Sequence, residues 1–140
     1  LDPTSNYYED YSNLGLSEDE ISSEHQPDSY LTHEGFLRAA CYLDQLLREK
    51  VIEALDKFPN YTLLICGHSL GAGVASLLSL IWSQRFPYVR CVCLGPPCVF
   101  NLPAARLVDP IITSVIIGDD FVSRLSLGSC YDLRDACLYL

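Results

Sequence analysis

Residues 61 to 82 read YTLLICGHSLGAGVASLLSLIW, and the elements encoded there set the architecture of the chain. A short apolar run, Leu63 to Cys66, is typical of a strand buried on both faces of a parallel sheet. A glycine-containing turn follows at residues 67 to 71, and the residues after it are apolar on all sides of a helix. The segment therefore predicts a strand, a sharp turn and a helix in direct succession.

The turn has the pattern Gly-x-Ser-x-Gly, with Ser69 at its centre. A serine hydroxyl is a weak nucleophile, and a tight strand-to-helix turn lifts it clear of the backbone, in strained geometry. Side chains two positions away would collide, so Gly67 and Gly71 are expected there, and Ala72 and Gly73 keep the helix entrance thin. This context predicts a nucleophile elbow. The alternative is a glycine-rich turn that only packs a helix against a sheet.

The backbone N–H of Leu70 adds a second chemical feature to this turn. It lies at the helix N-terminus, where unpaired donors and the positive end of the helix dipole meet. It is therefore placed to stabilise an oxyanion on a carbonyl group that Ser69 attacks.

Charge is distributed unevenly along the 140 residues, whose formal net charge is −9. Residues 1 to 30 contain eight acidic residues and no Lys or Arg, whereas the remainder is close to neutral. We expect an acidic, flexible segment at residues 1–30 and one domain at residues 31–140. Without a basic patch, a nucleic acid is not an expected partner.

Seven cysteines are present, an odd number with no C-x-x-C pair. Cys66, Cys91 and Cys93 fall in predicted buried strands, where thiols pack as small apolar groups. A cytoplasmic location, or the cytosolic face of a membrane, is favoured over a disulfide framework or a zinc site. No signal peptide and no membrane-spanning apolar run is visible. The chain begins with Leu rather than Met, as a fragment of a longer protein would.

The flanking sequence alternates between helical and strand patterns. Apolar residues at helical spacing follow Thr32, a suitable N-cap, and this helix should end before Pro59 and pack on the sheet beside the first strand. Strands are predicted at residues 89–94 and 111–117, with a short helix at 101–109 between them. Alternating strands and helices predict an α/β fold with a mainly parallel sheet flanked by helices.

Two carboxylates follow the third predicted strand, at the same sheet edge as Ser69. Asp119 or Asp120 could orient a histidine that activates the serine, in the chain order Ser, Asp, His. The alternative is that an acid at this position only caps a turn or a helix.

The histidine of such a triad is not found in the expected place. His68 adjoins Ser69, so its ring should point away, whereas His25 lies in the acidic segment and His33 precedes the nucleophile. No histidine follows Asp120. The general base is therefore either absent or lies beyond Leu140.

Four segments resemble the class 3 (fungal-lipase-like) α/β-hydrolases, and most of all their diacylglycerol lipase branch. They are THEGF at residues 32–36, LICGHSLGAG at 64–73, the stretch from FP at 86–87 to GPP at 95–97, and GDDFVSRL at 118–125. The resemblance covers residues 32 to 126 in order and spacing.

This resemblance implies a role for several residues. Ser69 would be the nucleophile and Asp120 the triad acid, with Asp119 as a neighbour and Ser123 at a position where proline is usual. The elbow residues Gly67, His68, Gly71 and Gly73 match the family pattern. Two family elements are missing, the upstream strand that ends in an R-G-T-like turn and the C-terminal histidine, so the chain resembles a partial α/β-hydrolase domain. Residues 1–30 would connect that upstream turn to the first helix.

The implied function is a serine lipase that hydrolyses ester bonds of diacylglycerol or triacylglycerol through an acyl-enzyme on Ser69. The implied substrate is a neutral glycerolipid at a membrane or lipid-droplet surface, and no metal or organic cofactor is needed. Two alternatives stay open: another serine esterase or phospholipase, and a catalytically dead hydrolase-like binding module, since the histidine is missing. Because loss of a triad member can cost on the order of a millionfold in turnover, these 140 residues alone are expected to be inactive.

Overall fold

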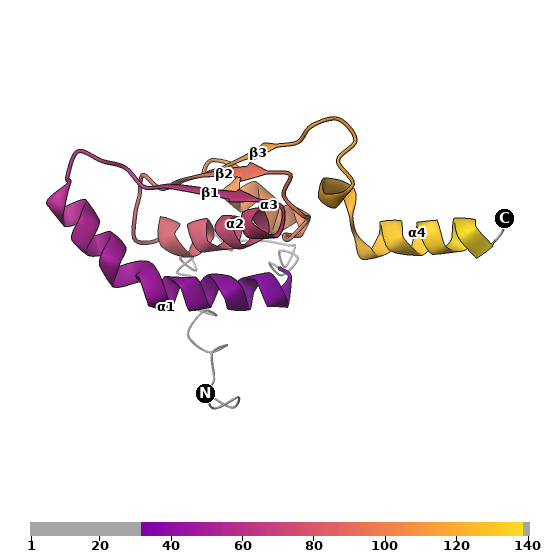
Figure 1. The fold of residues 1–140 in the computed structure, drawn as a ribbon, viewed down its shortest axis with the longest axis horizontal. Coiled ribbons are helices and arrows are strands. Elements are labelled where there is room, and N and C mark those ends of the chain that lie inside the picture. The colour runs from indigo at the N-terminus through magenta and orange to yellow at the C-terminus, as the bar shows by residue number, and fades with distance from the viewer. Residues whose placement is uncertain (1–31, 139–140) are drawn as a thin grey trace, which may run out of the picture.

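A computed structural model describes residues 32–138, so the predicted acidic segment lies outside the described residues. Three strands form one parallel sheet in the order β1-β2-β3, as the alternating sequence pattern predicted (Figure 1). In chain order the elements are α1 (Glu34–Lys57), β1 (Leu64–His68), α2 (Leu70–Ser83), β2 (Arg90–Leu94), α3 (Leu102–Val108), β3 (Ile112–Val115), the 3₁₀ turn η2 (Val122–Arg124) and α4 (Leu127–Leu138).

The strand register fixes which residues share a face of the sheet. Ile65 of β1 pairs with Cys91 of β2, which in turn pairs with Ile112 of β3. Because successive side chains of a strand alternate between faces, these three residues point to one side, where α2 packs against them. Because the strands are parallel, the carboxyl ends of all three lie at one edge of the sheet, and α2 begins directly after the end of β1 at that edge.

The body has three layers, with the sheet, α2 and α1 stacked in that order (Figure 1). Helix α2 lies in the middle, which explains why it is apolar all round and buried continuously from Ala72 to Ser79. Helix α1 packs on α2, so the expectation that α1 would pack directly on the sheet was wrong. The core between the two helices includes Ala40, Val74, Leu77, Leu78 and Trp82.

A buried carboxylate fastens α1 to α2. Asp44 is fully buried and accepts hydrogen bonds from Trp82 Nε1, at 2.7 Å, and from the guanidinium group of Arg48. Burial alone would raise the pKa of the Asp44 carboxyl, but the hydrogen bonds from Arg48 and Trp82 outweigh burial and hold the pKa below its usual range. The carboxylate is thus charged and fully partnered inside the interface of the two helices.

The opposite face of the sheet is open within residues 32–138. Leu64 and Cys66 of β1 are exposed there, and Leu94 and Val115 are about half exposed. The prediction that the first strand is buried on both faces was therefore wrong for the described part of the chain. Both α2 and α3 pack on the other face, and no described element covers this one.

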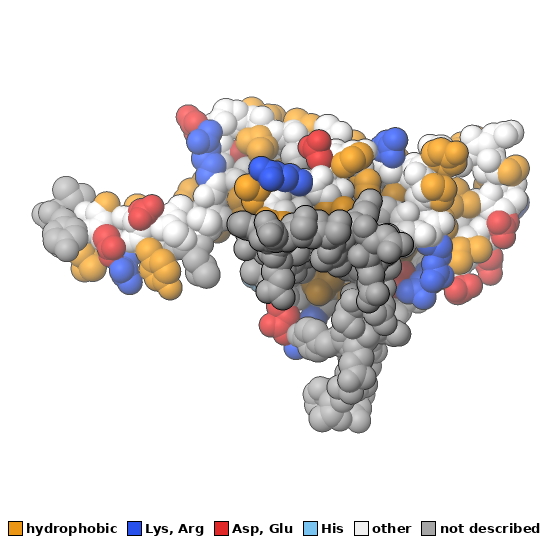
Figure 2. Space-filling view, turned by 180° about the vertical axis from the view of Figure 1, so that it is seen from behind, with side chains coloured by type: hydrophobic (Ala, Val, Ile, Leu, Met, Phe, Trp, Pro, Cys, Tyr) orange, Lys and Arg blue, Asp and Glu red, His pale blue; other side chains and the backbone are white. Residues whose placement is uncertain are grey.

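One local prediction also needs correction, and one helix was not predicted. The N-cap of α1 is His33 rather than Thr32, whose hydroxyl instead donates a hydrogen bond to Val99 O at 2.8 Å. Helix α4 was not predicted, and it projects away from the body with Tyr131 and Leu133 exposed (Figures 1 and 2). Among the described helices, none combines the length and the apolar character that crossing a membrane requires.

Candidate active site

Ser69 occupies the turn between β1 and α2 in strained backbone geometry. Its φ of 52° and ψ of −124° place it in a region that residues other than glycine rarely adopt, which confirms the predicted strain. Its N–H donates a hydrogen bond to Leu94 O, the last residue of β2, at 2.9 Å. A Cβ atom at Gly67 would lie 2.4 Å from Gly71 O, so no side chain fits there.

The glycines after Ser69 differ in what surrounds them. A Cβ atom at Gly73 would lie 2.7 Å from the Phe36 ring and 3.0 Å from Pro97, so α1 and the segment after β2 both approach the helix here. A Cβ atom at Gly71 would meet nothing within 4 Å. The collision expected at Gly71 is therefore not found among the described residues, because this glycine faces outward at the start of α2.

The first turn of α2 leaves the Leu70 amide available. The N–H groups of Ala72 and Gly73 both donate to Ser69 O, at 2.9 and 3.3 Å. Leu70 is the first residue of the helix, so its N–H has no acceptor inside the helix. This donor belongs to the residue after the serine, which is where the sequence placed the predicted oxyanion donor.

Asp120 lies beside the elbow, in the turn after β3. Its Oδ1 accepts the Val122 N–H at 2.9 Å, and Ser123 Oγ is 3.5 Å from Oδ2. Gly95 has a φ of +53°, and a Cβ atom there would lie 2.7 Å from Asp120 Oδ2. Since Gly95 directly follows Leu94, which bonds to Ser69, one dipeptide contacts both predicted catalytic residues. Asp119, in contrast, is almost fully exposed and pairs with Arg124.

The described histidines do not complete a triad. His68 and His33 are both exposed, and the His33 ring meets Phe36 edge-on, with 4.9 Å between ring centroids. Neither donates to Asp120 or accepts from Ser69 within residues 32–138. His25 lies outside the described residues. Likewise, no cluster of three His, Cys, Asp or Glu side chains that could hold a metal ion exists in this part of the chain.

Two buried thiols of β2 pack against the helix that follows Ser69. Cys91 and Cys93 are buried with their sulfur atoms 3.4 Å apart, and Cys93 donates to Ala72 O. The hydrogen bond with Cys91 and burial both raise the pKa of Cys93, so it stays a protonated packing residue. These two positions match the predicted buried thiols, whereas Cys66 is exposed. None of the seven cysteines forms a disulfide.

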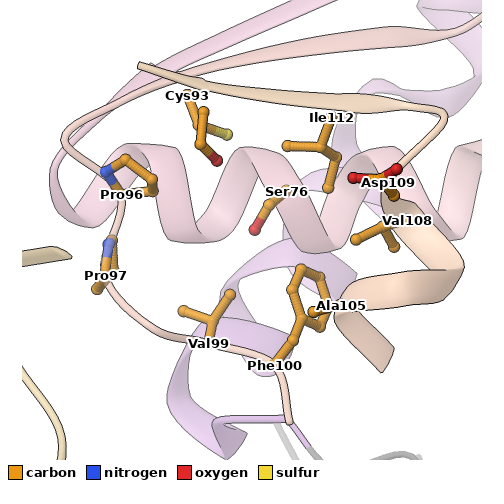
Figure 3. Close-up of a pocket in the computed structure, with 11 residues that line it drawn as sticks. Ser76, Cys93, Pro96, Pro97, Val99, Phe100, Ala105, Val108, Asp109 and Ile112 are labelled. Atoms are coloured by element: carbon orange, nitrogen blue, oxygen red, sulfur yellow. The ribbon is translucent and has the colours of Figure 1, made fainter. Parts of the chain in front are cut away.

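A mainly apolar pocket of about 250 Å³ lies between α2, α3 and the sheet (Figure 3). Cys93 and Ile112 line it from the sheet, Ser76 from α2, and Pro96 and Pro97 from the segment after β2. Neither Ser69 nor Asp120 lines this pocket. It is therefore separate from the candidate catalytic residues, although Pro97 also contacts the elbow helix.

One contact near the site was missed by sequence reasoning. Cys98 Sγ donates a hydrogen bond to Ser123 O at 3.2 Å and so links the segment after β2 to the loop that carries Asp120. The only signal was the Gly95-Pro96-Pro97 run, which indicates a stiff segment beside the elbow. Nothing in the sequence places Cys98 next to Ser123.

Comparison with known proteins decides the family. The sequence model described as Lipase (class 3) matches residues 4–129, beginning inside the acidic segment. The chain belongs to the class 3 lipase family. Among curated relatives of this class 3 lipase chain, mouse diacylglycerol lipase-beta is 32% identical over 107 residues, which are 74% of this chain and 16% of the relative. Human diacylglycerol lipase-alpha is 28% identical over 114 residues, 76% of this chain and 11% of the relative.

Solved structures agree with the fold. Lipase II from Rhizopus niveus has a TM-score of 0.65 at 26% identity and covers 76% of this chain and 44% of its own. A triacylglycerol lipase described as having a serine protease triad has a TM-score of 0.66 at 24% identity and covers 78% of this chain and 44% of its own. At this level of identity, the likeness shows a shared α/β-hydrolase fold and nothing about function. The class 3 lipase chain thus spans less than half of these structures and a small part of the curated relatives.

Proposed function

We propose that this chain is the nucleophile-bearing part of a serine lipase that hydrolyses acylglycerols. One observation carries the proposal: strained Ser69 and the Asp120 carboxylate lie on either side of Leu94 and Gly95, at the carboxyl edge of the sheet. The diacylglycerol lipase relatives support diacylglycerol as the substrate, with triacylglycerol as the next candidate.

The chemistry follows from the positions of these groups. Ser69 Oγ would attack the ester carbonyl carbon, and the Leu70 N–H would donate to the oxygen that becomes negatively charged. The alcohol part of the glycerolipid would leave, and water would then release the fatty acid from the acyl-enzyme. Asp120 would orient the histidine that accepts the Ser69 proton, a residue that would have to come from outside residues 32–138.

The environment of the reaction is part of the same proposal. Acylglycerols are poorly soluble, so we expect the native protein to work at a membrane or lipid-droplet surface, on its cytosolic side. Leu70 and Phe121 are both about two-thirds exposed next to Ser69 and Asp120, which supports contact of this edge with lipid.

The test is hydrolysis by the native protein that contains these residues. Diacylglycerol, triacylglycerol and a phospholipid would be offered in mixed micelles, and release of fatty acid would be followed. We expect diacylglycerol to be cleaved fastest, and Ser69→Ala to lower turnover by at least about a thousandfold. The control is Ser83→Ala at the far end of α2, which should keep the wild-type rate. Faster cleavage of the phospholipid would favour the phospholipase alternative.

One observation favours a different function. Within the described residues Asp120 accepts only from Val122 and Ser123 of its own loop, as in a simple turn, and no histidine approaches it. A hydrolase-like binding module without catalytic activity has the same features. Native protein that binds diacylglycerol vesicles but releases no fatty acid would favour this module over the lipase.

A further inference from the structure

The segment after β2 connects the parts of the candidate site. We define residues Leu94–Phe100 as the bridging segment. Leu94 O accepts the Ser69 N–H, and the Gly95 N–H donates to Val115 O of β3, both at 2.9 Å. Pro97 packs against α2 at Gly73, and Val99 O accepts the His33 N–H at the start of α1. This segment is therefore fixed to the elbow, to β3 and to α1.

The acid loop, residues Gly118–Leu125, has fewer attachments. The hydrogen bonds of Asp120 are internal to it, since they come from Val122 and Ser123. The Asp119–Arg124 ion pair is also internal, and both side chains are largely exposed. Nothing in these contacts holds the loop against the elbow.

Within residues 32–138, two contacts join the acid loop to the bridging segment. Gly95 lies against the Asp120 carboxylate, where a side chain would not fit. Cys98 Sγ donates a hydrogen bond to Ser123 O at 3.2 Å. Among the described residues, this hydrogen bond connects the bridging segment to the acid loop. The thiol thus limits how far the loop, and Asp120 with it, can move away from Ser69.

We propose that Cys98 is a positioning residue, which holds the acid loop so that Asp120 stays in place beside Ser69. The proposal rests on the proposed function, because it gives Asp120 the role of the triad acid. Cys98 itself touches no reacting atom and acts through the Ser123 backbone.

The test is amide hydrogen exchange, measured by NMR or mass spectrometry on the native protein that contains these residues. The Val122 N–H is the best probe because it donates to Asp120 Oδ1 and exchanges only when that bond opens. In Cys98→Ala we expect exchange at Val122 and Leu125 to be about two- to fivefold faster, as loss of one weak hydrogen bond allows. Core amides such as that of Leu77 should keep their rates.

Two further variants sharpen the result. Cys98→Ser keeps a hydrogen-bond donor, so the Val122 amide should regain most of its protection from exchange. If Cys98 only fills space, the Val122 amide should exchange as fast in Cys98→Ser as in Cys98→Ala. Cys137→Ala is the matched control, since it removes an exposed cysteine at the far end of α4. It should leave the acid loop unchanged.

Unchanged exchange at Val122 in Cys98→Ala would overturn the proposal, and so would equal loosening in Cys98→Ser. If the variants do not fold, iodoacetamide can alkylate Cys98 in the folded chain, with Cys66, Cys130 and Cys137 replaced by serine. The same acceleration is expected after alkylation, and its absence would contradict the proposal. Hydrogen exchange is measured without any catalytic turnover. The result can therefore be interpreted even if the protein proves not to be a lipase.

Discussion

At the scale of single residues, the elbow depends on where a side chain can and cannot be accommodated. Gly67 is enclosed by the backbone of Gly71 and Ala72, which cannot move without opening the turn. Gly71 has open space around its Cα, although both glycines belong to the same motif. The motif therefore contains one glycine required by packing and one that the described residues do not constrain.

Replacing these two glycines separates their roles. We expect Gly67→Ala to lower the free energy of unfolding by about 1–3 kcal/mol, because the new methyl group overlaps backbone atoms. Gly71→Ala should be neutral or raise it by up to about 1 kcal/mol, since alanine favours the first turn of α2. Urea unfolding followed by circular dichroism measures both. Equal destabilisation by the two variants would contradict the elbow geometry described above.

At the scale of the elements, the contact between α1 and α2 depends on a charged group. Asp44 is fully buried and bonded to Trp82 and Arg48, and its pKa is held below the usual range. A carboxyl whose pKa is lower in the folded state stabilises that state above its unfolded pKa. This stabilisation is lost as the pH falls through the folded pKa.

Acid should therefore weaken the packing of α1 on α2. We expect Asp44→Asn to unfold at lower urea concentration than wild type at pH 7, with a loss of about 1–3 kcal/mol. The difference should begin to shrink below about pH 4, where Asp44 of the unfolded wild-type chain becomes protonated, and it should vanish only below the lower pKa of the folded carboxyl. Urea midpoints between pH 7 and pH 3 measure this. A difference that stays constant with pH would show that the charge of Asp44 does not matter.

Much of the element order could be predicted from the sequence, because strand and helix periods leave direct patterns. Three parallel strands, the elbow and the long first helix are all found near their predicted positions. The partner of α1 could not be predicted, since its apolar stripe fits a helix as well as a sheet. The Cys98–Ser123 contact joins residues 25 positions apart through two loops, for which no periodic pattern exists.

At the scale of the whole molecule, the sheet has one covered and one open face. The apolar run of β1 predicted a strand that is buried on both faces of the sheet. Within residues 32–138, however, Leu64 and Cys66 are exposed. The sequence pattern reports the apolar character of the strand but not which segment covers each face. Buried Cys91 and Cys93 and exposed Cys66 thus report on opposite faces.

Thiol reactivity can test this description of the two faces. In the folded chain, a thiol reagent such as DTNB should react rapidly with exposed Cys66, Cys98, Cys130 and Cys137. Cys91 and Cys93 should react at least about a hundredfold more slowly, because they require opening of the core. Peptide mapping after timed labelling identifies each site. Protection of Cys66 to the level of Cys91 would mean that the face of β1 described as open is covered in solution.

The whole account depends most on Ser69 as an activated nucleophile. The most direct measurement is labelling of the native protein with a fluorophosphonate, followed by mass spectrometry of the modified peptide. We predict a single adduct on Ser69, absent in Ser69→Ala and retained in Ser83→Ala. Folded native protein that forms no adduct, or forms one on another serine, would contradict the assignment of the Gly67–Gly71 turn as a catalytic nucleophile elbow.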